Sequence, residues 1–231
     1  DGHQRIIIMH QNQPWATRAA DNFRKSFASL GGKVAKQMVY SGAGDHSEAI
    51  TNALLISQSK ARASDLQSDL AGTGNKVKFE PRRRQDIDAI VLFSMPQDGR
   101  QIIPTLAFHY ASDLPVYASH HIYQGPTKDS RDKDLDKVVF TDLPWLIKQI
   151  PLREQVSKTW LDKERYTRLF ALGLDAHQLY PKLNELSNDP SASIEGMTGN
   201  LKMNSDNRIV SQRSWGRFKS GKVVSAESVE Q

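Results

Sequence analysis

Uninterrupted runs of apolar residues recur along the chain and predict the strands of one parallel sheet. The clearest run covers residues 89–93, where five apolar residues in a row are followed by Ser94 and then by Pro96. Similar runs occur at residues 114–119 and 137–140. A half-exposed strand would alternate apolar and polar side chains, whereas a continuous run is typical of a strand covered on both faces. We therefore expect these runs to form the centre of a layered α/β fold.

The amino-terminal part of the chain alternates between strand-like and helix-like patterns. Residues 5–9 form a short apolar run, and Pro14 then begins a stretch with apolar positions at helical spacing that ends before Gly31. Proline suits the first position of a helix and glycine its carboxyl end. A second strand-like run covers residues 34–40 and precedes another helical pattern. This alternation of strands and helices predicts a doubly wound parallel sheet.

After residue 151 the pattern changes. Residues 165–186 are apolar on more than one side, which predicts a helix that is mostly buried. The rest of the chain has turn residues between short strand-like segments, which favours a carboxy-terminal β-meander. The expected strands of this meander cover residues 193–203, 208–219 and 222–224. We thus expect an α/β lobe over residues 1–150, and crossover helices with the meander over residues 151–231.

Composition narrows the function only slightly. The 231 residues are 38% hydrophobic and 25% charged, which is ordinary for a globular protein. The absence of cysteine excludes disulfides and thiolate chemistry. A formal net charge of +5 is compatible with an anionic partner, but the excess is modest and both signs are spread along the chain, so a solvated surface is the simpler explanation.

Polar and aromatic side chains follow the predicted strands at the points where they end. Loops that leave the carboxyl ends of parallel strands meet along one edge of a sheet, where such folds bind ligands. This strand-end edge consists of Gln13, Trp15, Ser94, His120, Tyr123, Asp142 and Trp145. In a bilobed binding protein the edge faces the cleft and holds a small polar ligand. The same residues equally fit packing between two lobes, and both interpretations stay open.

The strand-end edge offers little catalytic chemistry. His120 and His121 are the first candidates for metal ligands or a base, but neighbouring residues of an extended strand point in opposite directions. Asp142 is the one acidic residue that we can place on the same edge. The chain also lacks the Gly-x-Ser-x-Gly pattern of a nucleophile elbow. We therefore expect no metal site, no cofactor and no enzymatic activity.

The densest positive charge in the chain is the run Arg82, Arg83 and Arg84. It is a candidate surface for an acidic partner, with a solvated loop as the simpler explanation. A nucleic-acid patch would carry interleaved aromatic residues, and Phe79 is the one aromatic residue nearby. We therefore expect no nucleic-acid partner.

A second candidate partner surface is the alternating set Arg213, Trp215 and Arg217. On a strand these three side chains share one face, whereas Phe218 points to the other. A tryptophan between arginines is typical of interface hot spots. A packed edge-strand tryptophan with arginine stems lying beside it would have the same pattern.

Three short stretches occur in order in the second half of the chain: Asp-Leu-Pro-Trp at 142–145, Ala-Leu-Gly-Leu-Asp-Ala at 171–176 and Gly-Met-Thr-Gly at 196–199. Together with the strand and helix at residues 7–15 and beyond, this combination resembles the carboxy-terminal domain of the LpoA family, also called LppC or YraM. The resemblance implies the second lobe of a type I periplasmic-binding-protein fold. Residues 151–231 would then return toward a first lobe that is largely absent from this chain.

The resemblance also implies a function and a location. Full-length members of this family are lipid-anchored at the periplasmic face of the outer membrane and activate a class A penicillin-binding protein, a peptidoglycan synthase. The resemblance thus predicts a non-catalytic regulator that contacts this synthase and is not itself inserted into the membrane. The alternative is a periplasmic solute-binding lobe for a small polar ligand such as an amino acid or a peptidoglycan fragment.

Overall fold

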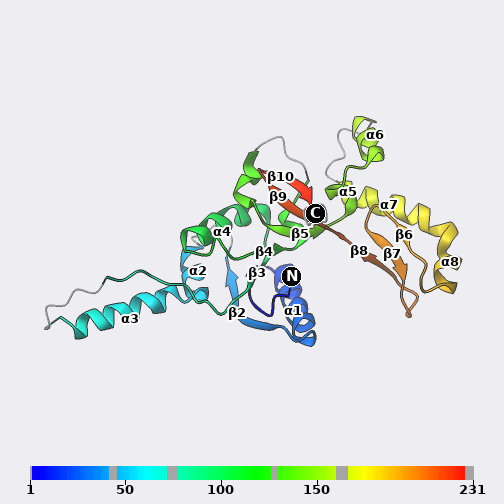
Figure 1. Ribbon diagram of the computed structural model, residues 1–231. Helices are drawn as coiled ribbons and strands as arrows, with labels where there is room; N and C mark the ends of the chain where they lie inside the picture. Colours follow the sequence, from blue (N-terminus) through cyan, green and yellow to red (C-terminus); the bar gives the residue numbers. More distant parts are fainter. Residues whose placement is uncertain (1, 42–45, 72–77, 126–129, 160–165, 227–231) are drawn as a thin grey trace.

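Within the residues that the structure describes, the main sheet has seven strands in the order β10-β9-β5-β4-β3-β1-β2 (Figure 1). The computed structural model describes residues 2–41, 46–71, 78–125, 130–159 and 166–226. The strands of the main sheet are β1 (Arg5–Gln11), β2 (Lys33–Tyr40), β3 (Ala89–Phe93), β4 (Val116–Ala118), β5 (Val139–Asp142), β9 (Ser214–Lys219) and β10 (Lys222–Ser225). Strands β1 to β5 pair in parallel, so the predicted doubly wound parallel sheet is confirmed.

Helices cover both faces of this sheet (Figure 1). The α-helices are α1 (Pro14–Ser29), α2 (Ser47–Ala53), α3 (Ile56–Asp69), α4 (Pro96–Phe108), α5 (Pro144–Ile147), α6 (Pro151–Thr159), α7 (Thr167–Leu179) and α8 (Leu183–Asn188). Short 3-10 helices are η1 (His120–Ile122), η2 (Ser130–Leu135) and η4 (Tyr180–Lys182). None of the helices within the described ranges has the length and apolarity needed to cross a membrane.

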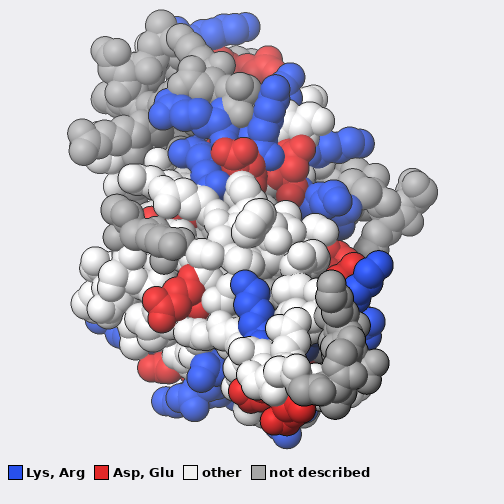
Figure 2. Space-filling model, turned by 90° about the vertical axis from the view of Figure 1, so that its left-hand side faces the viewer, with Lys and Arg blue, Asp and Glu red and all other residues white. Residues whose placement is uncertain are grey.

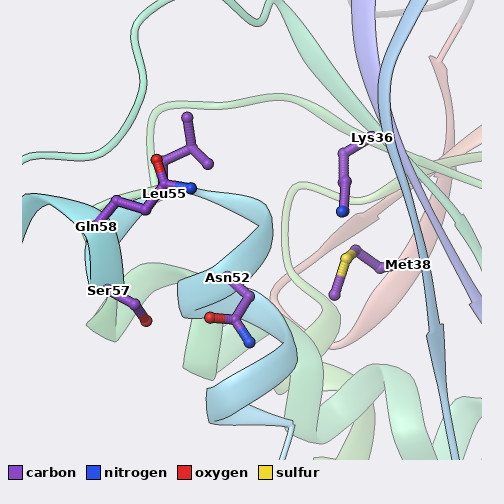
Figure 3. Close-up of a pocket in the computed structure, with 6 residues that line it drawn as sticks. All are labelled: Lys36, Met38, Asn52, Leu55, Ser57 and Gln58. Atoms are coloured by element: carbon purple, nitrogen blue, oxygen red, sulfur yellow. The ribbon is translucent and has the colours of Figure 1, made fainter.

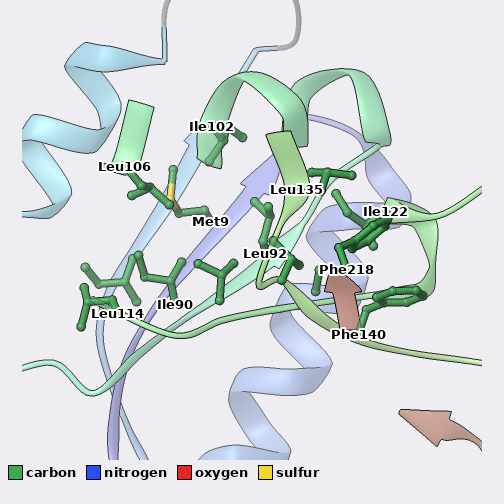
Figure 4. Close-up of a cluster of buried hydrophobic side chains, with 14 of the residues drawn as sticks. Met9, Ile90, Leu92, Ile102, Leu106, Leu114, Ile122, Leu135, Phe140 and Phe218 are labelled. Carbon is green, nitrogen blue, oxygen red and sulfur yellow. The ribbon is translucent and has the colours of Figure 1, made fainter. Parts of the chain in front are cut away.

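The continuous apolar strands divide their side chains between two cores, as the alternation of a strand requires. Ile90 and Leu92 of β3 point toward α2, α4 and η2, where Ile102 and Leu135 meet them (Figure 4). The neighbouring Val91 of β3 points to the opposite face and packs with α1. Fully burying a side chain of this size contributes about 1.5–3 kcal/mol, so both layers stabilise the central strands.

The carboxy-terminal strands do not form one meander. Strands β6 (Ile194–Glu195), β7 (Asn200–Met203) and β8 (Ile209–Gln212) make a separate three-stranded antiparallel sheet beside α7 and α8 (Figure 1). Strands β9 and β10 instead pair antiparallel in the main sheet next to β5. Phe218 explains this division, because its ring packs 5.0 Å from that of Phe140 in the main core.

The helical pattern at residues 165–186 also differs from its prediction. Residue 165 lies outside the described residues, and the helix is interrupted by η4. Within α7, Ala171 and Asp175 are the buried residues. Leu169 is 64% exposed and Leu172 is 56% exposed, so the prediction of a mostly buried helix was wrong. The main core covers one side of the helix, and its other apolar side faces outward.

Candidate functional site

The strand-end edge lies where β1, β3, β4 and β5 end. Parallel pairing places these carboxyl ends at the same side of the sheet, and the seven residues selected from the sequence lie at these ends or shortly after them. Arg168 of α7, which was not selected from the sequence, joins two of these strand ends, those of β4 and β5. Its guanidinium reaches the side chain of Asp142 and the backbone carbonyl oxygens of His120 and Tyr123.

Asp142 and Arg168 form a buried ion pair. The carboxylate of Asp142 is fully buried, and its Oδ2 atom lies 2.5 Å from Nη2 of Arg168. Its Oδ1 atom accepts a hydrogen bond from the backbone N–H of Leu143 at 2.8 Å. A buried carboxylate is tolerated when it is paired and hydrogen-bonded. The position of Asp142 at the end of an apolar strand could therefore have predicted that a lysine or arginine elsewhere in the chain pairs with its carboxylate.

Trp145 lies beside the Asp142–Arg168 pair, in the contact between the end of β5 and α7 that we call the junction. Its side chain is 1% exposed, and its indole Nε1 donates a hydrogen bond to Oγ1 of Thr167 at 2.9 Å. Its backbone N–H donates to the carbonyl oxygen of Met197 at 3.1 Å. The tryptophan thus links the loop after β5 to α7 and to the turn before β7.

Asp175 completes the junction from α7. Its carboxylate accepts hydrogen bonds from the backbone N–H groups of Met197 and Thr198, at 2.6 and 2.7 Å, and from Oγ1 of Thr198. A Cβ atom on Gly196 would lie 2.7 Å from Oδ2 of Asp175, so a side chain there would crowd the carboxylate. The three stretches that carry the family resemblance therefore contact one another, and this junction holds β6 and β7 against the main sheet.

The accessible part of the strand-end edge is an aromatic stack. The Trp15 ring stacks on that of His121 with centroids 4.1 Å apart, and the ring of His121 lies 4.0 Å from that of His120. The prediction that the two histidines point in opposite directions was therefore wrong, because they lie in η1 and not in an extended strand. These three side chains are partly exposed, and Gln13 beside them is exposed. By contrast, Ser94 is fully buried and donates to its neighbour's carbonyl oxygen.

Burial keeps the aromatic groups of the edge neutral. It lowers the pKa of His120 to about 3, with a smaller contribution from the positive charges of His121, Arg213 and Arg168. Burial likewise lowers the pKa of His121 and raises that of Tyr123 to about 12. Near neutral pH the histidines are therefore neutral hydrogen-bonding groups next to arginine charges. In the part of the chain that the structure describes, no group of three His, Asp or Glu side chains could hold a metal ion.

Two of the three arginines at residues 82–84 form ion pairs within the chain. Arg83 forms an ion pair with Asp113 at 2.5 Å and donates to the carbonyl oxygen of Tyr110. Arg84 pairs with Asp86 at 2.7 Å, and this hydrogen bond lowers the pKa of that carboxyl to about 2. Arg82 is exposed. On the face shown in Figure 2, Lys and Arg side chains are interspersed with Asp and Glu side chains around a mostly uncharged centre.

The second partner candidate forms a more open surface. Trp215 is 43% exposed and shares its face of β9 with Arg217, while Ser214 and Phe218 point inward and are buried. The predicted alternation is therefore confirmed for Trp215, Arg217 and Phe218, whereas Arg213 directly precedes the strand. The ring of Tyr117, on β4, lies 6.3 Å from that of Trp215. We call Tyr117, Arg213, Trp215 and Arg217 the β9 surface.

Comparison with known proteins identifies the family. The family model described as "LppC putative lipoprotein" matches residues 1–221. A relative from Photobacterium profundum, named penicillin-binding protein activator LpoA, is 25% identical over 232 residues, which cover 97% of this chain and 37% of the relative. The chain thus spans little more than a third of that relative's length.

Two solved structures share the fold. The LpoA (YraM) C-domain from Haemophilus influenzae, described as a regulator of PBP1A, is 16% identical with a TM-score of 0.65 over 96% of this chain and 61% of that one. A solute-binding protein of an ABC transporter from R. palustris, in complex with benzoate, is 13% identical with a TM-score of 0.55 over 97% of this chain and 58% of that one. The expected periplasmic-binding-protein-like fold is confirmed. With the match over residues 1–221, the chain belongs to the LppC lipoprotein family.

Proposed function

We propose that this chain is part of a non-catalytic activator of a class A penicillin-binding protein, the peptidoglycan synthase, and acts by protein–protein contact at the periplasmic face of the outer membrane. The observation that carries the proposal is the family match over residues 1–221, together with a relative named penicillin-binding protein activator. The chain covers 37% of that relative. The proposal therefore concerns what the surfaces of this chain contribute to activation.

The β9 surface is the contact that we propose for the synthase. Trp215 is 43% exposed on a strand that β5 and β10 hold from both sides. A large aromatic side chain on a rigid strand loses little conformational entropy on binding. Arg213 and Arg217 flank it with charges that attract an acidic partner. Arg83 and Arg84 support the proposal less, because their guanidinium groups are already paired with aspartates.

We also propose that residues 151–212 return toward a first lobe, as the resemblance to bilobed proteins implies. The later part of the segment 151–231 instead contributes β9 and β10 to the main sheet. The support is the outward apolar side of α7, where Leu169 and Leu172 are more than half exposed. Tyr180, at the end of this helix, is 81% exposed. Large apolar surfaces of this kind mark places where another layer of protein packs.

A binding experiment tests the proposed function. The affinity of this chain for a purified class A penicillin-binding protein is measured for the original chain and for Trp215→Ala. Loss of a hot-spot tryptophan costs at least about 2 kcal/mol, so we expect the affinity to fall roughly 30-fold. Phe108→Ala is the matched control, because Phe108 is 78% exposed on α4. Equal affinities of both variants would rule out the β9 surface, and absence of binding by the folded chain would contradict the proposed function.

The second candidate function is a lobe that binds a small polar ligand at the strand-end edge. The open stack of Trp15 on His121 favours it, because partly exposed aromatic rings beside hydrogen-bonding groups are typical of such sites. A ligand that binds the folded state raises the unfolding temperature by mass action. Amino acids and peptidoglycan fragments that raise it for the original chain, but not for Trp15→Ala, would support this candidate. No shift with any of them would count against it.

A further inference from the structure

Strand β2 is an unusually long edge strand for this sheet. It has eight residues, more than any other strand in the described ranges, and it lies at the end of the main sheet. One side pairs with β1, and none of the described strands pairs with the other side. The opposite edge strand, β10, has four residues. Natural proteins keep exposed edge strands short, because their free N–H and C=O groups form a template for another strand.

The side chains of β2 select the kind of strand that could pair with it. Lys33, Lys36 and Val39 are its exposed residues, and Val39 is 51% exposed. Two copies of β2 placed edge to edge would bring these lysines together, and like charges across a strand pair are unfavourable. An acidic segment would be attracted instead. The edge therefore disfavours self-association and favours a negatively charged partner.

A pocket beside β2 gives such a segment a place for a side chain. The pocket encloses about 340 Å³ and is lined by Lys36, Met38, Asn52, Leu55, Ser57 and Gln58. Lys36 and Met38 extend from β2 toward α2, α3 and the turn between these helices, which carry the other four residues (Figure 3). The lining supplies one ammonium group, two amides and a hydroxyl, and it contains no carboxylate. This combination suits an acidic side chain with an apolar stem.

The pocket lies beside a break between two helices. Leu55 separates α2 from α3 and has a φ of 59°, in the left-handed region. A residue with a side chain pays roughly 1–2 kcal/mol for this conformation. A continuous helix would avoid that strain. Leu55 lines the pocket at this break, together with Asn52 of α2 and Gln58 of α3.

We propose that β2 is a docking edge for an extended acidic segment of the penicillin-binding protein. The segment adds to the sheet as a further strand and places a Glu or Asp side chain in the pocket at Lys36. Backbone hydrogen bonds to the free edge then supply affinity, and the pocket supplies specificity. The identity of this partner rests on the proposed function, whereas the chemistry of the segment follows from β2 itself. The docking edge is separate from the β9 surface, which lies toward the other end of the sheet.

Amide hydrogen exchange and one charge reversal test the docking edge. Exchange of the amides of residues 33–40 is measured with and without the purified synthase, and affinities are measured for Lys36→Glu and for Lys60→Glu. Lys60 is an exposed residue of α3 and does not line the pocket. We expect at least tenfold slower exchange in β2 and at least tenfold weaker binding of Lys36→Glu, with Lys60→Glu within about twofold of the original chain.

The outcomes separate this inference from the proposed function. Binding of the synthase with unchanged exchange in β2, or with equal affinities for the original chain and Lys36→Glu, would overturn the docking edge and leave the proposed function standing. Failure of the folded original chain to bind the synthase would contradict the proposed function and the docking edge together. Unfolding curves of both variants that match the original chain establish that a weaker affinity reflects lost contacts.

Discussion

The carboxylate of Asp142 lies 2.5 Å from the guanidinium of Arg168 and joins the main sheet to α7. Asp142 ends β5, and Arg168 follows 26 residues later in the first turn of the helix. The aspartate is fully buried, whereas 34% of the arginine side chain is exposed. The pair therefore fixes how the carboxy-terminal part of the chain leaves the sheet.

Breaking this pair on one side should destabilise the protein. Arg168→Met leaves a buried carboxylate without its cation, which costs about 3–5 kcal/mol in a fully buried pair. We expect roughly 2–3 kcal/mol here, because Arg168 is partly exposed. Asp142→Asn combined with Arg168→Met should cost less than the sum of the two single changes. Urea unfolding measures the four free energies, and additive effects would show that the two side chains do not act as a pair.

The turn held by Asp175 should be sensitive to the loss of one carboxylate oxygen. Asp175→Asn cannot accept all three hydrogen bonds from Met197 and Thr198. A buried donor left without an acceptor costs about 1–3 kcal/mol. Asp206→Asn is the matched control, because Asp206 is exposed and surface changes stay within about 0.5 kcal/mol. Equal free energies of unfolding for both variants would contradict the structural role of Asp175.

Substitutions at two residues of β9 should differ in their effects: one should lower the stability of the fold and the other should weaken binding of the synthase. Phe218 is 1% exposed and packs on Phe140, so Phe218→Ala should lower the free energy of unfolding by about 3–5 kcal/mol. Trp215→Ala should lower it much less, because the side chain lies on the open face, yet it should weaken binding of the synthase. If Trp215→Ala destabilised the fold as strongly as Phe218→Ala, the tryptophan would be a packing residue and the β9 surface would lose its support.

The histidine pair should make stability depend on pH. The pKa of His120 is lowered from 6.5 to about 3, mainly by burial. Between these values the unfolded chain binds a proton that the folded chain does not, so stability falls as the pH is lowered from 6.5 toward 3. The limit is about 1.4 kcal/mol per pH unit, and partial exposure of the ring reduces it. His120→Gln should flatten the dependence measured by unfolding at several pH values, and an unchanged slope would show that the histidine is not responsible.

Local patterns in the sequence were enough to predict the central strands and the first helix. Continuous apolar runs and the proline at position 14 report on burial and helix starts within a few residues. The division of the last strands between two sheets could not be predicted in this way. It depends on the packing of Phe218 against Phe140, which no neighbouring residue reveals. The same reason applies to α7, whose apolar pattern cannot tell which of its sides the main core covers.

The strand-end edge shows the same limit. Its residues were correctly placed at or just after the ends of parallel strands, because topology alone brings these strand ends together. The internal contacts of Asp142 and Trp145 depend on Arg168 and Thr167, which follow more than twenty residues later. The ion pair between Arg83 and Asp113 could not be predicted from local patterns either, because thirty residues separate the two side chains. A ligand role for the seven edge residues therefore stays a prediction.

Activation by this chain is measured as the rate of peptidoglycan synthesis by a purified class A penicillin-binding protein with and without the chain. We expect the folded chain to raise the rate, Trp215→Ala to lose most of this increase, and Phe108→Ala to keep it. An unchanged rate at concentrations that saturate the measured binding would contradict the claim that these surfaces activate the synthase.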